Sequence, residues 1–383
     1  MIEKKRLFFL ALLPGFLACL IFLGVYLFSS DNTLRTPPPV FEEIYSSRSD
    51  LREKIRNIDY AIYESLYRSG VRERNISFQN VETRHQNGNI WNFTEISVKC
   101  PDSQCTRNLQ ITITHDLTAL GPEISYRYEK TPDNGIVCHI SAQDFYTHKI
   151  VLSFDSQRLP VKDVRSRVAI IIDDLGYEPD IALSFIQLNL PLSLSVLPCA
   201  PFTDLIVREA TEKGSELILH LPMEPKHYPS VNPGSGALFL SMEEQEILRM
   251  LNQDLEDIPG ARGVNNHMGS SFTENREKML IVLKELKKRN LFYIDSRTTS
   301  DTVGFELARD IGLPAAKRSV FLDNDLAPKA IKIQLERLLS MARHSGFAIG
   351  IGHPHKETLK ILREYQSGIK AEFHVVHVSE LVR

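Results

Sequence analysis

The sequence predicts an α/β protein whose C-terminal half is an irregular (β/α) barrel, and two observations support this fold class. Val168–Ile172 is a continuous run of mostly β-branched residues, which is typical of a strand covered on both faces of a parallel sheet. Similar apolar runs alternate with helical patterns as far as residue 377. About eight strands and about six helices are too many for a small open sheet but match a barrel of right-handed βαβ units.

The N-terminus predicts a membrane anchor. Basic residues at positions 4–6 precede an uncharged apolar run, Leu7–Phe28, and about 20 such residues suffice to span a bilayer. A cleaved signal peptide, the alternative, has a shorter apolar core and a small-x-small site. We therefore expect residues 1–28 to be a cytoplasmic tip and a single-pass anchor in a bacterial inner membrane. The bulk of the chain would lie in the periplasm or outside the cell.

A small α+β domain of unknown role is expected over residues 41–155, joined to the anchor by a proline-rich linker over residues 29–40. Phe41–Tyr67 has apolar residues at helical spacing and predicts a helix. Segments of alternating polarity follow, and alternation with intervening turn residues predicts antiparallel strands. These segments cover residues 76–81, 92–98, 109–114, 124–128, 135–140 and 149–153.

Composition excludes nucleic acid as a partner and leaves open whether the cysteines form a disulfide. The net charge is −3, and the chain beyond its N-terminus has no basic block of the kind that binds nucleic acid. An exported domain could form a disulfide among Cys100, Cys105 and Cys138, although spacing does not choose the pair. A zinc knuckle at Cys100 and Cys105 lacks companion ligands at zinc-site spacing.

The predicted strands of the barrel domain, residues 165–383, repeatedly end in carboxylates, histidines or amides. In parallel α/β folds these ends converge on one face and form the site. Individually, Asp174 could cap a helix, His220 could be a core histidine, and Asp323–Asp325 could be turn residues. The full set is Asp173 and Asp174 after the first strand, His220 and Glu224 after the third, Asn265, Asn266 and His267 after the fourth, Asp295 after the fifth, Asp323 and Asp325 after the sixth, and His353 and His355 after the seventh.

Carboxylate and imidazole side chains together suit a divalent metal, with zinc the leading candidate and iron or nickel as alternatives. Three protein ligands and a water form a catalytic rather than a structural metal site. A second carboxylate beside the metal can act as a base. Asp173 and Asp174 can supply both functions if the strand end lets these neighbours enter the same pocket.

Five ordered segments resemble the divergent polysaccharide deacetylase family, a distant branch of the NodB-like carbohydrate esterases. They are residues 168–176, 220–225, 263–270, 293–296 and 351–355. The resemblance covers residues 165–383 but not residues 30–160. It implies a NodB-like, (β/α)7-like barrel and metal-assisted hydrolysis of N-acetyl groups on a cell-envelope polysaccharide such as peptidoglycan.

The resemblance also implies roles for individual residues. Asp173 corresponds to the base, Asp174 and His220 to metal ligands, and His353 to the general acid. Glu224 stands where ordinary NodB-like enzymes have a second ligand histidine, so His267 or Glu224 would replace it, and we assign the ligand role to His267. The arginine motif of those enzymes is replaced by residues 265–270. We assign substrate binding to Asn266, Glu224, Asp295 and His355.

The sequence thus predicts a membrane-tethered, metal-dependent deacetylase of an envelope polysaccharide. The alternative is a non-catalytic envelope module that binds glycan or a cell-wall enzyme, with residues 41–155 as the surface for an envelope protein partner. A metal phosphoesterase is a third, weaker hypothesis because a glycine-rich phosphate loop is missing from the sequence.

Overall fold

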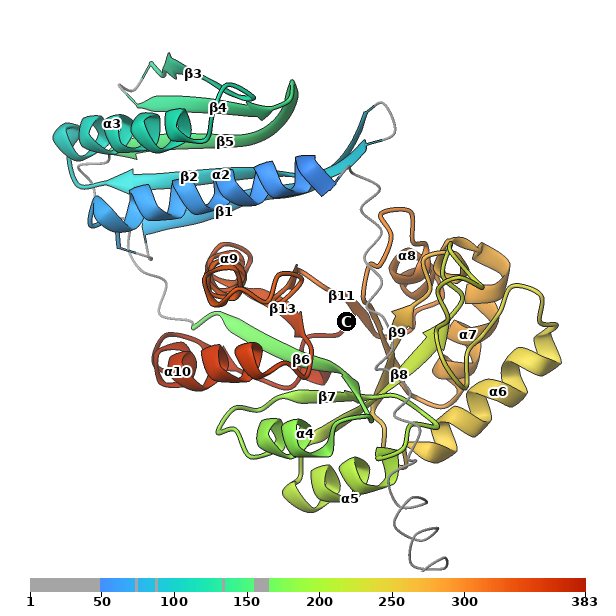
Figure 1. Cartoon of the computed structure of the whole chain (residues 1–383). Coiled ribbons are helices and arrows are strands. Elements are labelled where there is room, and N and C mark those ends of the chain that lie inside the picture. Colours follow the sequence, from blue (N-terminus) through green and yellow to red (C-terminus); the bar gives the residue numbers. More distant parts are fainter. Residues whose placement is uncertain (1–48, 73–74, 87–88, 133–134, 155–164) are drawn as a thin grey trace, which may run out of the picture. The chain divides into compact units, whose positions relative to one another are not determined.

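The computed structural model describes residues 49–72, 75–86, 89–132, 135–154 and 165–383, and its strands form two sheets (Figure 1). The predicted anchor and linker lie outside the described residues. Among the helices that the structure describes, none is long and apolar enough to cross a bilayer.

The first sheet has five strands in the order β1-β2-β5-β4-β3. Neighbouring strands are antiparallel, as predicted, except for the parallel pair β2 and β5. Helices α2 and α3 contact one another and bury apolar side chains against this sheet. The elements are α2 (Ser49–Arg68), β1 (Ile76–Gln86), β2 (Asn89–Cys100), α3 (Ser103–Ala119), β3 (Ile124–Lys130), β4 (Ile136–Ala142) and β5 (Phe145–Phe154).

The prediction of a strand over residues 109–114 is wrong, because this segment lies inside helix α3. Its buried residues are Thr106, Leu109, Ile113 and Leu117, three or four positions apart, whereas Ile111 is 68% exposed. Helical spacing therefore describes the burial, and the alternation of Leu, Ile and Ile is incidental. The helix also has a clear start, because the carboxylate of Asp102 accepts a hydrogen bond from the backbone N–H of Cys105 at 2.7 Å.

Replacing Asp102 with alanine should lower the free energy of unfolding by about 1 kcal/mol, the usual cost of removing an N-cap. Asp102→Asn keeps a side-chain acceptor and should cost less. Urea denaturation followed by circular dichroism would measure both variants. Equal stability of Asp102→Ala and the wild type would show that the cap does not hold α3 in place.

The second sheet is a curled, parallel barrel with one open seam. Its strands follow the order β11-β10-β9-β8-β7-β6-β13-β12, and β14 also pairs with β6. The end strands β11 and β12 are not paired with each other in this order, so the barrel opens between them. The strands are β6 (Arg167–Leu175), β7 (Ser193–Val196), β8 (Glu216–Met223), β9 (Gly263–Met268), β10 (Phe292–Asp295), β11 (Ala315–Lys317), β12 (Val320–Phe321), β13 (Phe347–Gly352) and β14 (His374–Val375).

Helices connect these strands, and the predicted alternation is confirmed with two corrections. Helix α4 was not predicted, because its short segment has proline at the start and few periods of apolar spacing. The predicted sixth strand, which precedes Asp323, is two strands, β11 and β12. The helices are α4 (Pro179–Ile186), α5 (Thr203–Lys213), α6 (Glu244–Asp257), α7 (Arg276–Lys288), α8 (Gly304–Asp310), α9 (Pro328–Ser345) and α10 (Lys356–Glu372), with short turns η2 (Phe272–Glu274) and η3 (Val378–Glu380).

Strand β6 has two apolar faces, which explains its continuous run of β-branched residues. Val168, Ile170 and Ile172 pack in the cluster that includes helix residues such as Phe185 of α4. Ala169 and Ile171 belong to a second cluster, which contains alternate residues of the other strands and the C-terminal residues Val376, Val378 and Leu381. The C-terminal segment therefore helps to fill the barrel, and the next residue of the inward-facing series is Asp173.

Candidate metal centre

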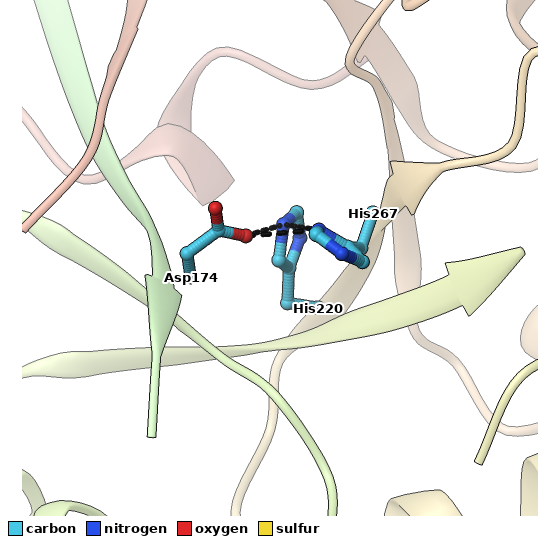
Figure 2. Close-up of side chains that lie close together, drawn as sticks. All are labelled: Asp174, His220 and His267. Atoms are coloured by element: carbon cyan, nitrogen blue, oxygen red, sulfur yellow. Dashed lines mark hydrogen bonds and ion pairs between the residues drawn. The ribbon is translucent and has the colours of Figure 1, made fainter. Parts of the chain in front are cut away.

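Within the described part of the chain, Asp174, His220 and His267 form a compact group of possible metal ligands (Figure 2). Asp174 Oδ1 lies 2.9 Å from His220 Nε2 and 2.9 Å from His267 Nδ1. The two ring nitrogens are 3.2 Å apart. The residues come from the C-terminal halves of β6, β8 and β9, as expected for parallel strands whose carboxyl ends share one face.

The backbone of β6 explains how both aspartates reach this group. The pairing of β6 with β7 shifts register between Ile172 and Leu175. Within that irregularity Asp174 has φ of 56°, in the left-handed region. Such a bulge re-aims a side chain, which in a regular strand would face the opposite side from its neighbour. Left-handed backbone is costly for most residues and less so for Asp and Asn.

Asp173 and His220 share one neighbour, Asn265. The amide nitrogen of Asn265 donates to Asp173 Oδ1 at 2.8 Å and to Oδ2 at 3.0 Å. Its carbonyl oxygen lies 2.9 Å from His220 Nδ1. All three side chains are buried, so the proposed base and one proposed ligand are held by a single amide.

His353 is hydrogen-bonded to Asp323. His353 Nδ1 lies 2.8 Å from Asp323 Oδ1, and the backbone N–H of His353 donates to Oδ2 at 2.6 Å. The Thr358 hydroxyl also donates to Oδ2, at 2.6 Å. Burial lowers the pKa of His353, but Asp323 outweighs this effect, and with Asp174 and Asp173 it raises the pKa from its ordinary 6.5 to about 9. A protonated His353 can therefore serve as an acid at neutral pH.

Electrostatics favour an ionised Asp174. Burial raises the pKa of its carboxyl, but His267 and His220 outweigh burial and hold the pKa well below the ordinary 3.8. Burial lowers the pKa of His220, whereas Asp173 and Asp174 raise it above 6.5. Asp174 and His220 thus favour each other's charged forms.

The ligand atoms fit a divalent ion. Asp174 Oδ1 is buried and makes no hydrogen bond of good geometry, although two nitrogens lie 2.9 Å away. Ligands at about 2.0–2.2 Å from a tetrahedral zinc ion lie about 3.3–3.6 Å from one another, so the ligand atoms, now 2.9–3.2 Å apart, would need to separate only slightly. Two imidazoles and one carboxylate are also the ligand types of catalytic zinc sites. Asp174, His220 and His267 would hold the ion.

The comparisons with known proteins identify the family of the barrel domain. Residues 170–382 match the model of the family described as divergent polysaccharide deacetylase. The chain belongs to this family. Its deacetylase-family barrel is 33% identical over 216 residues to the uncharacterized protein YibQ of Escherichia coli (strain K12), covering 56% of this chain and 67% of YibQ.

Two further proteins are similar to this member of the family. An uncharacterized protein of Haemophilus influenzae (strain ATCC 51907 / DSM 11121 / KW20 / Rd) is 29% identical, covering 57% of this chain and 78% of its own. The crystal structure of the uncharacterized protein ATU2773 from Agrobacterium tumefaciens C58 is 26% identical, with a TM-score of 0.55. That match covers 58% of this chain and 92% of ATU2773.

Two residues assigned to substrate binding, Glu224 and Asp295, accept hydrogen bonds from backbone N–H groups. Glu224 Oε2 accepts a hydrogen bond from the N–H of Leu240 at 2.7 Å. Glu224 lies outside the ligand group, which contains His267 instead. Asp295 accepts from the N–H groups of Arg297 at 2.8 Å and Phe305 at 3.0 Å. A role of either residue in substrate binding stays a prediction.

The other two residues assigned to substrate binding, Asn266 and His355, lie in different surroundings. The Asn266 carbonyl accepts from the Tyr293 hydroxyl at 3.1 Å, and its amide donates to the Met268 carbonyl at 2.9 Å. His355 is half-buried, and its ring centroid is 6.2 Å from that of His353. His355 is thus beside the proposed acid, whereas Asn266 holds the local chain. Substrate binding by both remains a prediction.

The sequence analysis includes Asn265 and Asp323 among the strand-end residues but gives neither a role in the site. The two-residue period of a strand could have found Asn265, because it must face the same side as His267 while Asn266 faces the other. Asp323 was weighed as a turn residue. Asp323 follows β12, and His353 follows the neighbouring strand β13. These matching positions indicate that both side chains can reach the same face.

Proposed function

We propose that this chain is a metal-dependent hydrolase that removes N-acetyl groups from a cell-envelope polysaccharide. The observation that carries the proposal is the juxtaposition of a two-histidine, one-carboxylate ligand group with a second carboxylate, Asp173, which lies 3.8 Å from His220 Nε2. The family supports a carbohydrate substrate. The paired His353 and Asp323 supply the remaining component, a proton donor.

The reaction would proceed by addition of water to the acetyl carbonyl carbon and cleavage of the C–N bond. When bound, a divalent ion supplies Lewis acidity that polarises the carbonyl and acidifies water. Asp173, oriented by Asn265, would take a proton from the attacking water. His353, oriented by Asp323, would give a proton to the departing amine from Nε2, because Nδ1 faces Asp323. The products are acetate and the free amine.

We further propose that the chain acts outside the cytoplasm, tethered by the apolar segment Leu7–Phe28. An envelope glycan is the polysaccharide that such a tether would place within reach. A cysteine introduced into the barrel tests this location. In intact spheroplasts, a membrane-impermeant maleimide should react with it. Labelling only after lysis would contradict it.

The activity can be tested with the full chain purified in detergent, stripped of metal and resupplied with zinc, cobalt or nickel. Acetate release from chitooligosaccharides and from peptidoglycan should appear with metal and disappear with chelator. A wild-type protein that binds metal but releases no acetate from either substrate would contradict the proposal.

A non-catalytic glycan-binding module is the second candidate, and Glu224 favours it. This residue stands where ordinary NodB-like enzymes have a ligand histidine, and here it binds the backbone of Leu240. A module of this kind would bind peptidoglycan equally well after Asp173→Asn and His267→Ala. Loss of acetate release in those variants would favour the enzyme.

A further inference from the structure

The side chain of Asn265 makes four contacts in the buried end of the barrel. Its amide nitrogen donates to Asp173, as described, and to Ser296 Oγ at 3.2 Å. Its carbonyl oxygen accepts from Ser195 Oγ at 2.6 Å and faces His220 Nδ1 at 2.9 Å. Asn265 itself has 0% exposure. An amide has two donor hydrogens and one acceptor oxygen, so this environment uses all of its capacity.

The neighbours decide which way the amide points. The two oxygens of an ionised Asp173 can only accept hydrogen bonds, so the group that faces them must be the NH2 of Asn265. The carbonyl oxygen then has to face the opposite side, toward Ser195 and His220. The flipped amide would place its oxygen against the carboxylate and its NH2 against the ring.

The amide in turn decides the tautomer of His220. A carbonyl oxygen can only accept, so His220 Nδ1 must carry a hydrogen. In the neutral ring, Nε2 then carries the free electron pair. That electron pair faces Asp174 Oδ1 and His267 Nδ1, the other two possible ligand atoms. This is the tautomer that a metal ligand at Nε2 requires.

We propose that Asn265 is a positioning residue with two separable functions: its carbonyl fixes the ligand tautomer of His220, and its NH2 holds the carboxylate of Asp173. The inference rests on the proposed function for the role of Asp173 but on hydrogen-bond geometry alone for His220. Asn265 is not a catalytic residue, since it acts through the two side chains that it contacts.

Two variants separate these functions. Asn265→Asp keeps an oxygen acceptor for His220 Nδ1 but replaces the NH2 with an oxygen that repels Asp173. Asn265→Leu has similar size and removes both functions. Asn252→Asp is the matched control, because Asn252 lies on α6 and its Oδ1 accepts from Arg289, a contact that Asp preserves.

Zinc titration and acetate release should give different patterns for the two variants. Asn265→Asp should bind zinc as tightly as the wild type or more tightly, yet lose on the order of 10²-fold in kcat/KM. Asn265→Leu should bind zinc about 10–100-fold more weakly. Asn252→Asp should match the wild type in both. Equal loss of zinc affinity in the two Asn265 variants, or wild-type kcat/KM in Asn265→Asp, would overturn the proposal.

A readout without metal or turnover makes the inference independent of the proposed function. Nitrogen-15 NMR of histidine-labelled, metal-free full chain reports the tautomer of each neutral ring, with His220 assigned by its absence in His220→Gln. Because Asp173 and Asp174 raise the pKa of His220, the spectra are recorded at alkaline pH. His220 should be protonated at Nδ1 in the wild type and in Asn265→Asp, and lose this preference in Asn265→Leu. If the wild type neither binds zinc nor releases acetate, the proposed function fails, while an unchanged tautomer in Asn265→Leu would still refute the positioning role.

Discussion

Replacing Asp174 with asparagine should reduce kcat/KM on the order of 10³-fold or more, because the change removes one of three proposed ligands and with it the activation of water. Asparagine is the informative replacement. Position 174 has φ of 56°, and Asn tolerates the left-handed region as well as Asp does. The variant therefore keeps the backbone of the bulge while its side chain loses the charge that favours a cation.

Thermal unfolding separates ligand loss from misfolding in this variant. Zinc at about 100 times its Kd should stabilise the wild type by about 2.7 kcal/mol, and it should stabilise Asp174→Asn far less. Asp310→Asn is the matched control, since Asp310 is an exposed residue of α8 whose partner is Arg276. An Asp174→Asn protein that zinc stabilises as strongly as the wild type would remove Asp174 from the ligand set.

Replacing Asp323 with asparagine should move the alkaline limit of activity to lower pH. In the wild type, His353 stays protonated until the pH rises through about 9, so activity that needs the acid form should fall above that pH. Without the charge of Asp323, burial should lower the pKa of His353 toward the ordinary 6.5, although Asp174 and Asp173 still raise it. At pH 8 a pKa near 6.5 would leave about 3% of His353 in its acid form, so the variant should lose up to about 30-fold in kcat/KM.

Thr358→Val is the control for this effect, because it removes one hydrogen bond to Asp323 Oδ2 and leaves the charge in place. Its alkaline limit should stay near that of the wild type. A pH profile of kcat/KM for the wild type, Asp323→Asn and Thr358→Val measures the three alkaline limits. Coincident alkaline limits for Asp323→Asn and the wild type would show that Asp323 does not set the protonation of His353.

The pair of His353 and Asp323 should make the free energy of unfolding decrease as the pH rises. The pKa of His353 is higher in the folded protein, about 9, than its ordinary value of 6.5. The raised pKa of His353 adds about 3 kcal/mol to the free energy of unfolding, at 1.36 kcal/mol per pKa unit. This contribution is fully present below pH 6.5. It is lost as the pH rises from there through 9. Urea midpoints measured between pH 6 and pH 10 should fall in the wild type and change less in Asp323→Asn.

Much of the barrel was predictable because burial on two faces leaves a strong pattern. Val168–Ile172 is apolar throughout since its alternate residues enter two different clusters. The convergence of the strands that carry Asp174, His220 and His267 on one face follows from their parallel arrangement. The helix α3 was mispredicted because Leu109, Ile111 and Ile113 alternate like a strand, while the cap at Asp102 and the burial of every third or fourth residue decide the structure.

The finer geometry of the site could not be predicted, since it depends on backbone detail and on long-range partners. Asp174 enters the pocket through a bulge and a left-handed φ that its sequence does not specify. Asp323 is separated from His353 by 30 positions, and its local sequence is that of a turn. Asn265 is separated from Asp173 by 92 positions, so its hydrogen bonds require the folded sheet.

Metal uptake by the wild-type chain tests the central claim most directly. The full chain, stripped with chelator and dialysed against zinc, should retain one ion per chain by elemental analysis and bind it through Asp174, His220 and His267. X-ray absorption at the zinc edge should then report nitrogen and oxygen ligands at about 2.0–2.2 Å. A correctly folded wild type that retains no zinc, cobalt or nickel would contradict the account.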